Sequence, residues 1–213
     1  MIRFSHSPAR ISALSLALCL CAGPAPAQAE GTGTGADDAA IALFSASFSE
    51  SCAGAFEEDG SLVEAPQRHE VLAPSSWGEP EPVTVWQFSC ALYAYNTAQV
   101  FMIMDEGGGV QPVALACPTL QIEYDEEAAA PGEADSVVSV LKINGWSADL
   151  LAINAEFDPA TLTIRAHTYW RGLGDASDSS LWSLQDRAFR LQHFEADASY
   201  DGEINPVTLV DFR

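Results

Sequence analysis

Positive charge is scarce in this sequence. Nine lysine and arginine residues stand against 30 aspartate and glutamate residues, and the formal net charge at pH 7 is −21. From Glu30 onward, seven basic side chains face all 30 acidic ones, which gives this part a formal charge of −23. Such a surface repels phosphate backbones and anionic lipid headgroups, so it argues against nucleic-acid binding. It fits a cationic partner or bound cations, and it also fits the commoner case of an acidic surface that keeps a protein soluble in a salty compartment.

Sequence patterns of several well-known chemistries are missing as well. There is no Cys-x-x-Cys for thiol exchange and no His-Glu-x-x-His, and the histidines show no metal-ligand spacing. Ser147 lies in Gly-Trp-Ser-Ala-Asp, which lacks the second glycine of a nucleophile elbow. Gly172-Leu173-Gly174 lacks the third glycine, and the helix after it, that a dinucleotide loop needs. The sequence therefore contains no recognisable active site, and we expect a protein that is not an enzyme and needs no cofactor.

Long hydrophobic stretches are limited to the N-terminus. Two arginines precede the apolar stretch 11–22, helix-breaking Gly and Pro follow it, and residues 27–29 (Ala-Gln-Ala) have the small-x-small pattern of a signal-peptidase site. The stretch is too short to cross about 30 Å of hydrocarbon as a helix. We predict that residues 1–29 are a signal peptide that is cleaved after Ala29.

A lipid anchor is the alternative fate for this N-terminal segment. Cys19 and Cys21 lie at a suitable depth, but Leu18 and Leu20 precede them where a lipoprotein signal has small residues. No later stretch approaches the length of a membrane span. The expected product is an exported protein, periplasmic or secreted, with no membrane insertion after cleavage.

Three cysteines remain after residue 29, and an odd number in an oxidising compartment suggests one disulfide and one free thiol. The sequence alone allows three pairings. Cys52 lies on the apolar face of a predicted helix and Cys90 on the apolar face of a predicted strand, so Cys52–Cys90 is the best candidate. Closing this loop of about 40 residues would stabilise the fold by roughly 4 kcal/mol in the chain-entropy model. Cys117 would then be a buried free thiol.

The first ordered element is expected to be a helix. Residues 30–37 are rich in glycine and threonine and predict a flexible linker, and residues 38–213 have the length of a single domain. Asp37 or Asp38 is suited to cap the helix and Gly54 to end it. The apolar residues at helical spacing are Ile41, Phe44, Phe48 and Cys52.

The rest of the chain has the two-residue period of β-strands. Residues 62–82 are rich in proline and acid and predict an irregular connection, whereas Trp86, Phe88, Cys90 and Leu92 predict the apolar face of a strand. Asn144-Gly145 predicts a hairpin turn. Further strands are expected within 100–104, 110–116, 121–124, 137–143, 150–153, 161–170, 181–184, 188–195 and 207–212. The prediction is a mainly β fold, an antiparallel sandwich or barrel-like meander with one N-terminal helix.

One spacing near the C-terminus is typical of a calcium loop. Residues 197–204 place oxygen ligands at positions one, three and five, a glycine at six and an apolar residue at eight. Position twelve is Thr208, where a bidentate glutamate would be needed. A simple Asp-Gly turn between two strands is therefore the favoured interpretation. The candidate ligands for a hard cation, calcium in particular, are Asp197, Ser199, Asp201 and Glu203.

The C-terminal region also carries a motif with a family resemblance. The motif comprises Trp170-Arg171-Gly172-Leu173-Gly174-Asp175-Ala176-Ser177, Trp182, Phe189-Arg190-Leu191 and Tyr200-Asp201-Gly202-Glu203-Ile204-Asn205-Pro206, with Phe88-x-Cys90 and Ala94-Tyr95-Asn96 before it. With these residues the chain, over about 86–212, resembles a family of exported proteins of Gram-negative bacteria, domain of unknown function number 1176. The resemblance implies export and a β-rich domain. It implies no catalytic residues, because the family has no established activity.

The same motif residues have a structural interpretation of their own. The glycines permit tight turns, the tryptophans fill a core, and Arg171 can pair with Asp175 or Asp201. The residues expected to act as a scaffold are Trp170, Arg171, Gly172, Gly174, Asp175 and Gly202.

Three functions are compatible with the sequence. The first is a non-enzymatic periplasmic binding or inhibitor-like protein with a cationic target, such as a basic secreted enzyme, or an envelope component. The second is an envelope hydrolase of glycan or peptide, which requires a cleft with convergent carboxylates or a Ser/His pair. The third is a structural domain stabilised by calcium.

Overall fold

A computed structural model describes residues 34–105, 107–132 and 135–213. The predicted signal peptide and residues 30–33 of the predicted linker lie outside these ranges. The described part is mainly β, with antiparallel sheets and one α-helix, as the sequence predicts. None of the helices in these ranges is long and apolar enough to span a membrane.

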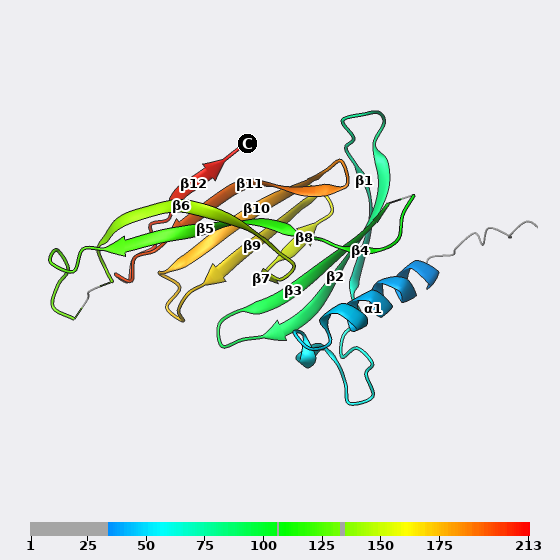
Figure 1. The fold of residues 1–213 in the computed structure, drawn as a ribbon, viewed down its shortest axis with the longest axis horizontal. Coiled ribbons are helices and arrows are strands. Elements are labelled where there is room, and N and C mark those ends of the chain that lie inside the picture. Colours follow the sequence, from blue (N-terminus) through cyan, green and yellow to red (C-terminus); the bar gives the residue numbers. More distant parts are fainter. Residues whose placement is uncertain (1–33, 106, 133–134) are drawn as a thin grey trace, which may run out of the picture. The chain divides into compact units, whose positions relative to one another are not determined.

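The elements follow the chain in a simple order (Figure 1). They are α1 (Thr34–Phe48), the 3-10 helix η1 (Ala53–Ala55), β1 (Gln67–Ala73), β2 (Glu81–Leu92), β3 (Thr97–Asp105), β4 (Gln111–Pro112), β5 (Leu115–Tyr124), β6 (Val138–Asp149), β7 (Ala152–Ile153), β8 (Glu156–Asp158), β9 (Thr163–Tyr169), β10 (Ser177–Gln185), β11 (Ala188–Asp197) and β12 (Val207–Asp211).

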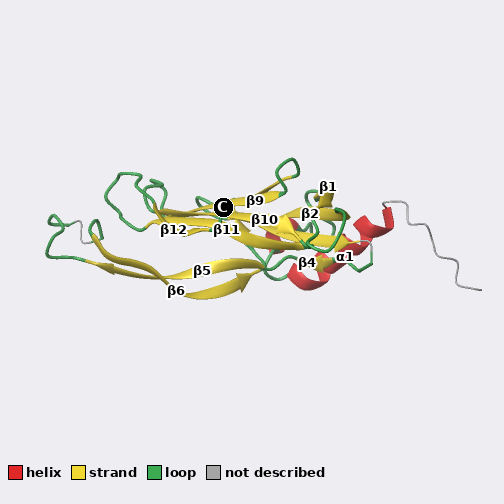
Figure 2. Cartoon of the chain, turned by 90° about the horizontal axis from the view of Figure 1, so that it is seen from above, coloured by secondary structure: helices red, strands yellow, loops and turns green. Residues whose placement is uncertain are grey.

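These strands form three antiparallel sheets. The first sheet has the order β1-β2-β3-β4, with β7 also pairing with β3. The second sheet has the order β12-β11-β10-β9-β8, and β5 and β6 form a two-stranded ribbon. Figure 2 shows the ribbon as a separate layer alongside the second sheet. Neighbouring strands are mostly consecutive in the chain, so the predicted sandwich or meander is consistent with this topology.

Helix α1 packs on one face of the first sheet. The ring of Phe44 stacks on that of Phe88 with centroids 4.4 Å apart, and Phe44, Phe88 and Phe48 are all buried. The disulfide Cys52–Cys90 links the segment after the helix to β2 and confirms the predicted pairing. A small apolar core, separate from the main one, therefore holds the helix in place.

The helix begins at Thr34, so the predicted linker boundary is wrong at residues 34–37. Asp37 lies in the first turn of the helix and does not cap it. Its Oδ1 accepts a hydrogen bond from Trp86 Nε1 at 2.8 Å and lies 3.0 Å from Arg68 Nε. These contacts with β1 and β2 fix the first turn, which local composition alone does not predict.

The main core lies between the opposite face of the first sheet, the ribbon and the second sheet. Residues 83–88 of β2 are buried on both faces, whereas the sequence suggests one apolar face. Leu92, predicted to face inward, is 83% exposed at the end of the strand. Trp182 is buried and its Nε1 donates to the Ala116 carbonyl at 2.9 Å, which ties the second sheet to the ribbon. Its members from the three sheets include Val85, Phe101, Leu115, Phe157, Ile164, Trp182, Leu191 and Phe194.

Two sequence-based assignments are wrong because contacts distant in sequence override local signals. Residues 67–73, placed in an irregular connection, form β1 and pair along their whole length with β2. Asn144-Gly145 makes no hairpin, because β6 continues to Asp149 and pairs with β5 throughout. Asn144 is the extra residue of a bulge, and a Cβ at Gly145 would lie 2.7 Å from Thr119 Oγ1. The glycine therefore permits close approach of two strands.

The neighbouring strand predictions need smaller corrections. Only residues 111–112 of the predicted strand 110–116 pair with β3, and its last two residues begin β5. Of the stretch 150–153, only Ala152–Ile153 is a strand, and it pairs with β3 instead of β6. Strands β9 to β12 lie close to their predicted positions.

Candidate functional site

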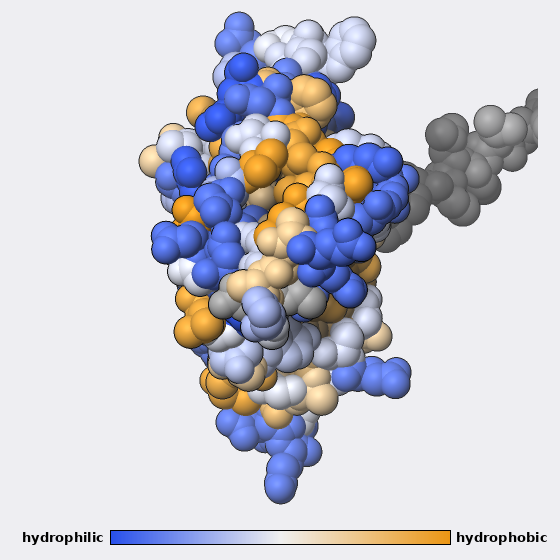
Figure 3. All heavy atoms as spheres, turned by 90° about the vertical axis from the view of Figure 1, so that its left-hand side faces the viewer, coloured by the Kyte–Doolittle hydropathy of each residue, from blue (hydrophilic) through white to orange (hydrophobic). Residues whose placement is uncertain are grey.

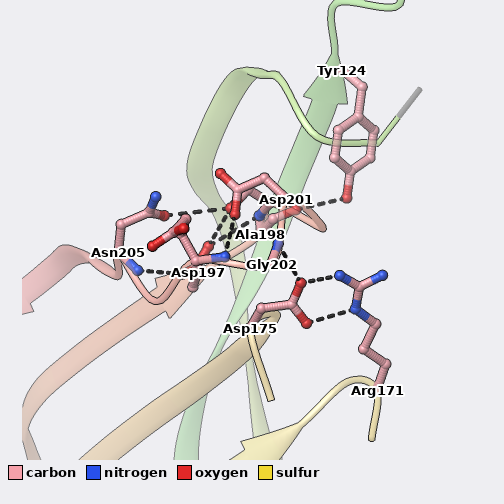
Figure 4. A network of polar contacts seen from close by, with 10 residues as sticks. Tyr124, Arg171, Asp175, Asp197, Ala198, Asp201, Gly202 and Asn205 are labelled. Atoms are coloured by element: carbon pink, nitrogen blue, oxygen red, sulfur yellow. Dashed lines mark hydrogen bonds and ion pairs between the residues drawn. The ribbon is translucent and has the colours of Figure 1, made fainter. Parts of the chain in front are cut away.

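Arg171 and Asp175 form the centre of a polar network where the connections β9–β10 and β11–β12 meet (Figure 4). Arg171 Nε donates to Asp175 Oδ1 at 2.6 Å, and a second guanidinium nitrogen binds Oδ2. The backbone N–H of Gly202 donates to the same Oδ2 at 2.9 Å. Asp175 is only 2% exposed, and the Arg171 guanidinium holds the pKa of this carboxyl well below its usual range. Of the two predicted partners of Arg171, Asp175 is the one that it binds.

The glycines of the motif serve two different purposes. Gly174 and Gly202 have φ values of +77° and +88°, which other residues rarely adopt, so the predicted tight turns are present there. Gly172 instead leaves room for a ring, because a Cβ there would lie 2.6 Å from Cε1 of Tyr95. The motif residues thus shape and fasten loops, as the scaffold interpretation expects.

The predicted calcium loop is closed by its own hydrogen bonds. Asp197 is 2% exposed and accepts from the Ser199 N–H at 3.1 Å, the Ser199 hydroxyl at 2.8 Å and the Asn205 N–H at 2.6 Å. Asp201 Oδ1 accepts from the Glu203 N–H at 2.9 Å. Within the described ranges, no three His, Cys, Asp or Glu side chains are grouped to hold a metal. These contacts build an Asp-Gly turn, and calcium binding stays a prediction.

The network also fastens the tip of the ribbon. The Tyr124 hydroxyl donates to the Ala198 carbonyl at 3.1 Å, and the Tyr200 N–H donates to the Asp135 carbonyl at 3.1 Å. The Arg171 guanidinium lies over the Tyr200 ring, 4.9 Å from its centroid. The ribbon connection 125–137 and the β11–β12 connection therefore lie side by side, which sequence spacing does not reveal.

Seven exposed carboxylates gather on these joined segments and on the adjoining end of β5, and we call this surface the acidic end. None of them takes part in an ion pair within the described residues. Figure 3 looks at the molecule from this side and shows hydrophilic groups around a smaller hydrophobic area. The members of the acidic end are Glu123, Asp125, Glu126, Glu127, Asp135, Asp201 and Glu203.

Most of the positive charge of the chain is already paired elsewhere. Among the residues that the structure describes, five of the seven basic side chains form ion pairs with carboxylates. Those five are Arg68, Arg171, Arg187, Arg190 and Arg213. Few basic side chains are therefore left to neutralise the remaining carboxylates, and these produce a negative electrostatic potential in the surrounding solvent.

The outer face of the second sheet carries a serine–histidine pair. Ser179 Oγ and His167 Nδ1 are 2.7 Å apart, and Ser179 lines an open groove of about 540 Å³. Arg165, His193 and Glu195 also line this groove. Ser179 lies on β10, which pairs with β9 and β11, so nearby N–H groups are used within the sheet. The pair therefore lacks the backbone donors that stabilise an oxyanion in acyl transfer.

Cys117 is a free thiol, as predicted, but it is half-buried and not buried. It lines a cavity of about 220 Å³ between the ribbon and the second sheet, together with Asp149 and Asp178. Burial, with the nearby charge of Asp149, raises the pKa of the thiol to about 12. A thiol of this kind is almost fully protonated at neutral pH, which disfavours a role as nucleophile.

We expect Cys117 to resist thiol reagents in the folded protein. At pH 8, reaction with a chromogenic disulfide such as DTNB should be at least about tenfold slower than after denaturation in guanidinium, because only the thiolate reacts. The comparison requires the bridge Cys52–Cys90 to stay oxidised. Equal rates in the folded and unfolded protein would show that the thiol is accessible and ionised.

Comparisons with protein-family models, with curated proteins and with solved structures found no match to this chain. The resemblance to domain of unknown function number 1176 therefore stays a prediction that rests on the quoted residues. The function has to be argued from the geometry and charge of this chain alone.

Proposed function

We propose that this protein is a non-enzymatic, periplasmic or secreted binding protein whose acidic end binds a cationic partner, such as a basic protein that it inhibits. The observation that supports it most is the gathering of seven exposed carboxylates, none in an ion pair within the described residues, on two connections that are hydrogen-bonded to each other and on the adjoining end of β5. Charges of one sign on neighbouring loops attract and orient an oppositely charged partner before contact. The Arg171–Asp175 network would keep these loops in a fixed arrangement, which lowers the entropy cost of binding.

Export is part of the same proposal. The disulfide Cys52–Cys90 is of a kind that persists in oxidising compartments, and it supports an exported protein. The sequence of residues 1–29 supports the same destination. The acidic surface would then face basic proteins or envelope components outside the cytoplasm.

The salt dependence of binding tests the proposal. Poly-L-lysine should bind the protein with an affinity that falls at least about tenfold between 50 and 200 mM salt, because exposed charge pairs are screened over about 10 Å. Poly-L-glutamate is the matched control and should not bind. Absence of polylysine binding, or an affinity that salt does not change, would overturn the proposal.

The alternative function, an envelope hydrolase, would have to use the Ser179–His167 pair and the groove beside it. A serine activated by a histidine should react with a fluorophosphonate probe, whereas a merely hydrogen-bonded serine should not. We expect no labelling of Ser179, because backbone donors for an oxyanion are lacking beside it. Labelling that disappears in Ser179→Ala would favour the hydrolase over the binding protein.

A further inference from the structure

The cavity between the ribbon and the second sheet contains two carboxylates without a cation. Asp178 from β10 and Asp149 from β6 both line it, and neither forms an ion pair with a lysine or arginine within the described residues. Trp170 Nε1 donates to Asp178 Oδ2 at 2.6 Å, and the Ser147 hydroxyl donates to Asp149 Oδ2 at 3.0 Å. These neutral donors hold the carboxylates in place but leave their charge uncompensated.

The electrostatic potential in the cavity is expected to be negative. Burial raises the pKa of the Asp178 carboxyl, and the charges of Asp149 and Asp178 contribute to the raised pKa of the Cys117 thiol. Hydrogen bonds from Trp170 and Thr168 and the electrostatic field of His167 act in the opposite direction and lower this pKa. Asp149 is exposed and Asp178 is half-buried. A cation with N–H donors in the cavity would compensate the charge of both carboxylates and offset the cost of removing Asp178 from water.

The remaining walls of the cavity are partly apolar, and Cys117, Thr168 and Ser180 also line it. Leu120, Ile153 and Phe194 line it from three different strands, and no lysine or arginine does. The volume of about 220 Å³ equals roughly seven times the ~30 Å³ that a water molecule occupies in the liquid, so it admits a ligand of only a few heavy atoms. A ligand that fits both the carboxylates and the apolar side chains has one positively charged, hydrogen-bonding end and a short hydrocarbon chain.

We propose that this cavity is a binding site for a primary alkylammonium group, with its N–H donors toward Asp178 and Asp149 and its methylene chain against Leu120, Ile153 and Phe194. This site is separate from the acidic end and does not depend on the partner proposed for that surface. The group can belong to a free small amine or to a lysine side chain, because both present an ammonium on a short aliphatic chain.

Titration calorimetry with n-butylamine at pH 7.5 and fixed ionic strength tests the site. The amine should bind saturably, and n-butanol, which keeps the chain and loses the charge, should bind at least about tenfold more weakly. Asp178→Asn should weaken amine binding by a similar factor, and Asp38→Asn, an equal charge change on an exposed residue of α1, should leave it unchanged. Asp149→Asn provides a second variant if Asp178→Asn melts at a lower temperature than wild type.

A lysine-containing tripeptide with blocked ends identifies the source of the ammonium. Binding of n-butylamine alone assigns the cavity to a free small amine, and binding of both ligands assigns it to lysine side chains as well. Three results would overturn the proposal: no saturable binding of n-butylamine, equal binding of n-butanol, or unchanged amine affinity in both Asp178→Asn and Asp149→Asn.

Discussion

Removing the Cys52–Cys90 disulfide is expected to lower the free energy of unfolding by about 4 kcal/mol. The two cysteines are 38 residues apart in the sequence, and the bridge restricts the unfolded chain over that loop. In the folded protein it joins the segment after α1 to β2, and both sulfurs lie in the small core beneath the helix. The double variant Cys52→Ala/Cys90→Ala, followed by urea denaturation, gives the value directly.

The third cysteine provides the control for this prediction. Cys117→Ala removes a half-buried thiol that takes no part in a bridge, so it should cost much less than the double variant. Addition of a reducing agent should destabilise wild type and Cys117→Ala but leave Cys52→Ala/Cys90→Ala unchanged. A double variant as stable as wild type would mean that the bridge adds nothing to stability.

Arg171→Ala is expected to be the most destabilising removal of a single charge. It leaves the Asp175 carboxylate, which is 2% exposed, with the Gly202 N–H as its remaining partner in the network. A buried charge that loses its counter-ion destabilises strongly, whereas a surface ion pair contributes little. The exposed pair Arg190–Asp186 has the same i,i+4 spacing, so Arg190→Ala is the matched control. We expect a drop in Tm of several degrees for Arg171→Ala and little change for Arg190→Ala.

The pH dependence of this effect has a defined sign. The pKa of Asp175 is lowered in the folded protein relative to 3.8 in a free chain, so the folded state favours the ionised carboxylate. The stabilisation is fully present above about pH 4 and is lost as the pH falls toward the lowered pKa. The difference in Tm between wild type and Arg171→Ala should therefore narrow below pH 4. A difference that stays constant from pH 7 to pH 2 would contradict this assignment.

A substitution that neutralises the buried carboxylate should partly rescue the variant. In Arg171→Ala/Asp175→Asn the remaining side chain is uncharged, and its oxygen can still accept from the Gly202 N–H. The double variant should melt above Arg171→Ala. If it melts lower, the destabilisation comes from lost packing of the arginine and not from an unpaired charge.

Features fixed by local pattern were predictable from the sequence. The alternation around Ile164 places β9 correctly, because a half-buried strand needs a two-residue period. The disulfide was predictable from the apolar spacing around both cysteines. The expected helix end at Gly54 is wrong, because α1 ends at Phe48 and Cys52 lies in the turn after it. Arg171 and Asp175 are four residues apart, so their ion pair was within reach of sequence reasoning.

Features fixed by contacts between distant segments were not predictable. Asn144-Gly145 has a strong hairpin signal, but Gly145 pairs with Thr119, which lies 26 residues earlier in β5. Strand β6 therefore continues past these two residues without a turn. The acidic end depends on Asp135 meeting Tyr200, and the cavity depends on β5 crossing β10 near Cys117. The local sequence does not show which residues of two distant strands pair with each other, so it does not predict that these residues lie together.

Neutralising the acidic end, with an equal change of charge elsewhere as control, tests the central claim most directly. Glu123→Gln, Asp125→Asn, Glu126→Gln and Glu127→Gln remove four of its exposed carboxylates. Glu50→Gln, Glu57→Gln, Glu58→Gln and Glu79→Gln remove four exposed carboxylates outside it and leave the same net charge.

Exposed charge pairs contribute about 0.2–1 kcal/mol each, so losing four at ~0.4 kcal/mol should weaken polylysine binding at 50 mM salt by about tenfold. The control variant should bind nearly as well as wild type. Equal weakening in both variants would contradict the account, because binding would then follow net charge and not the acidic end.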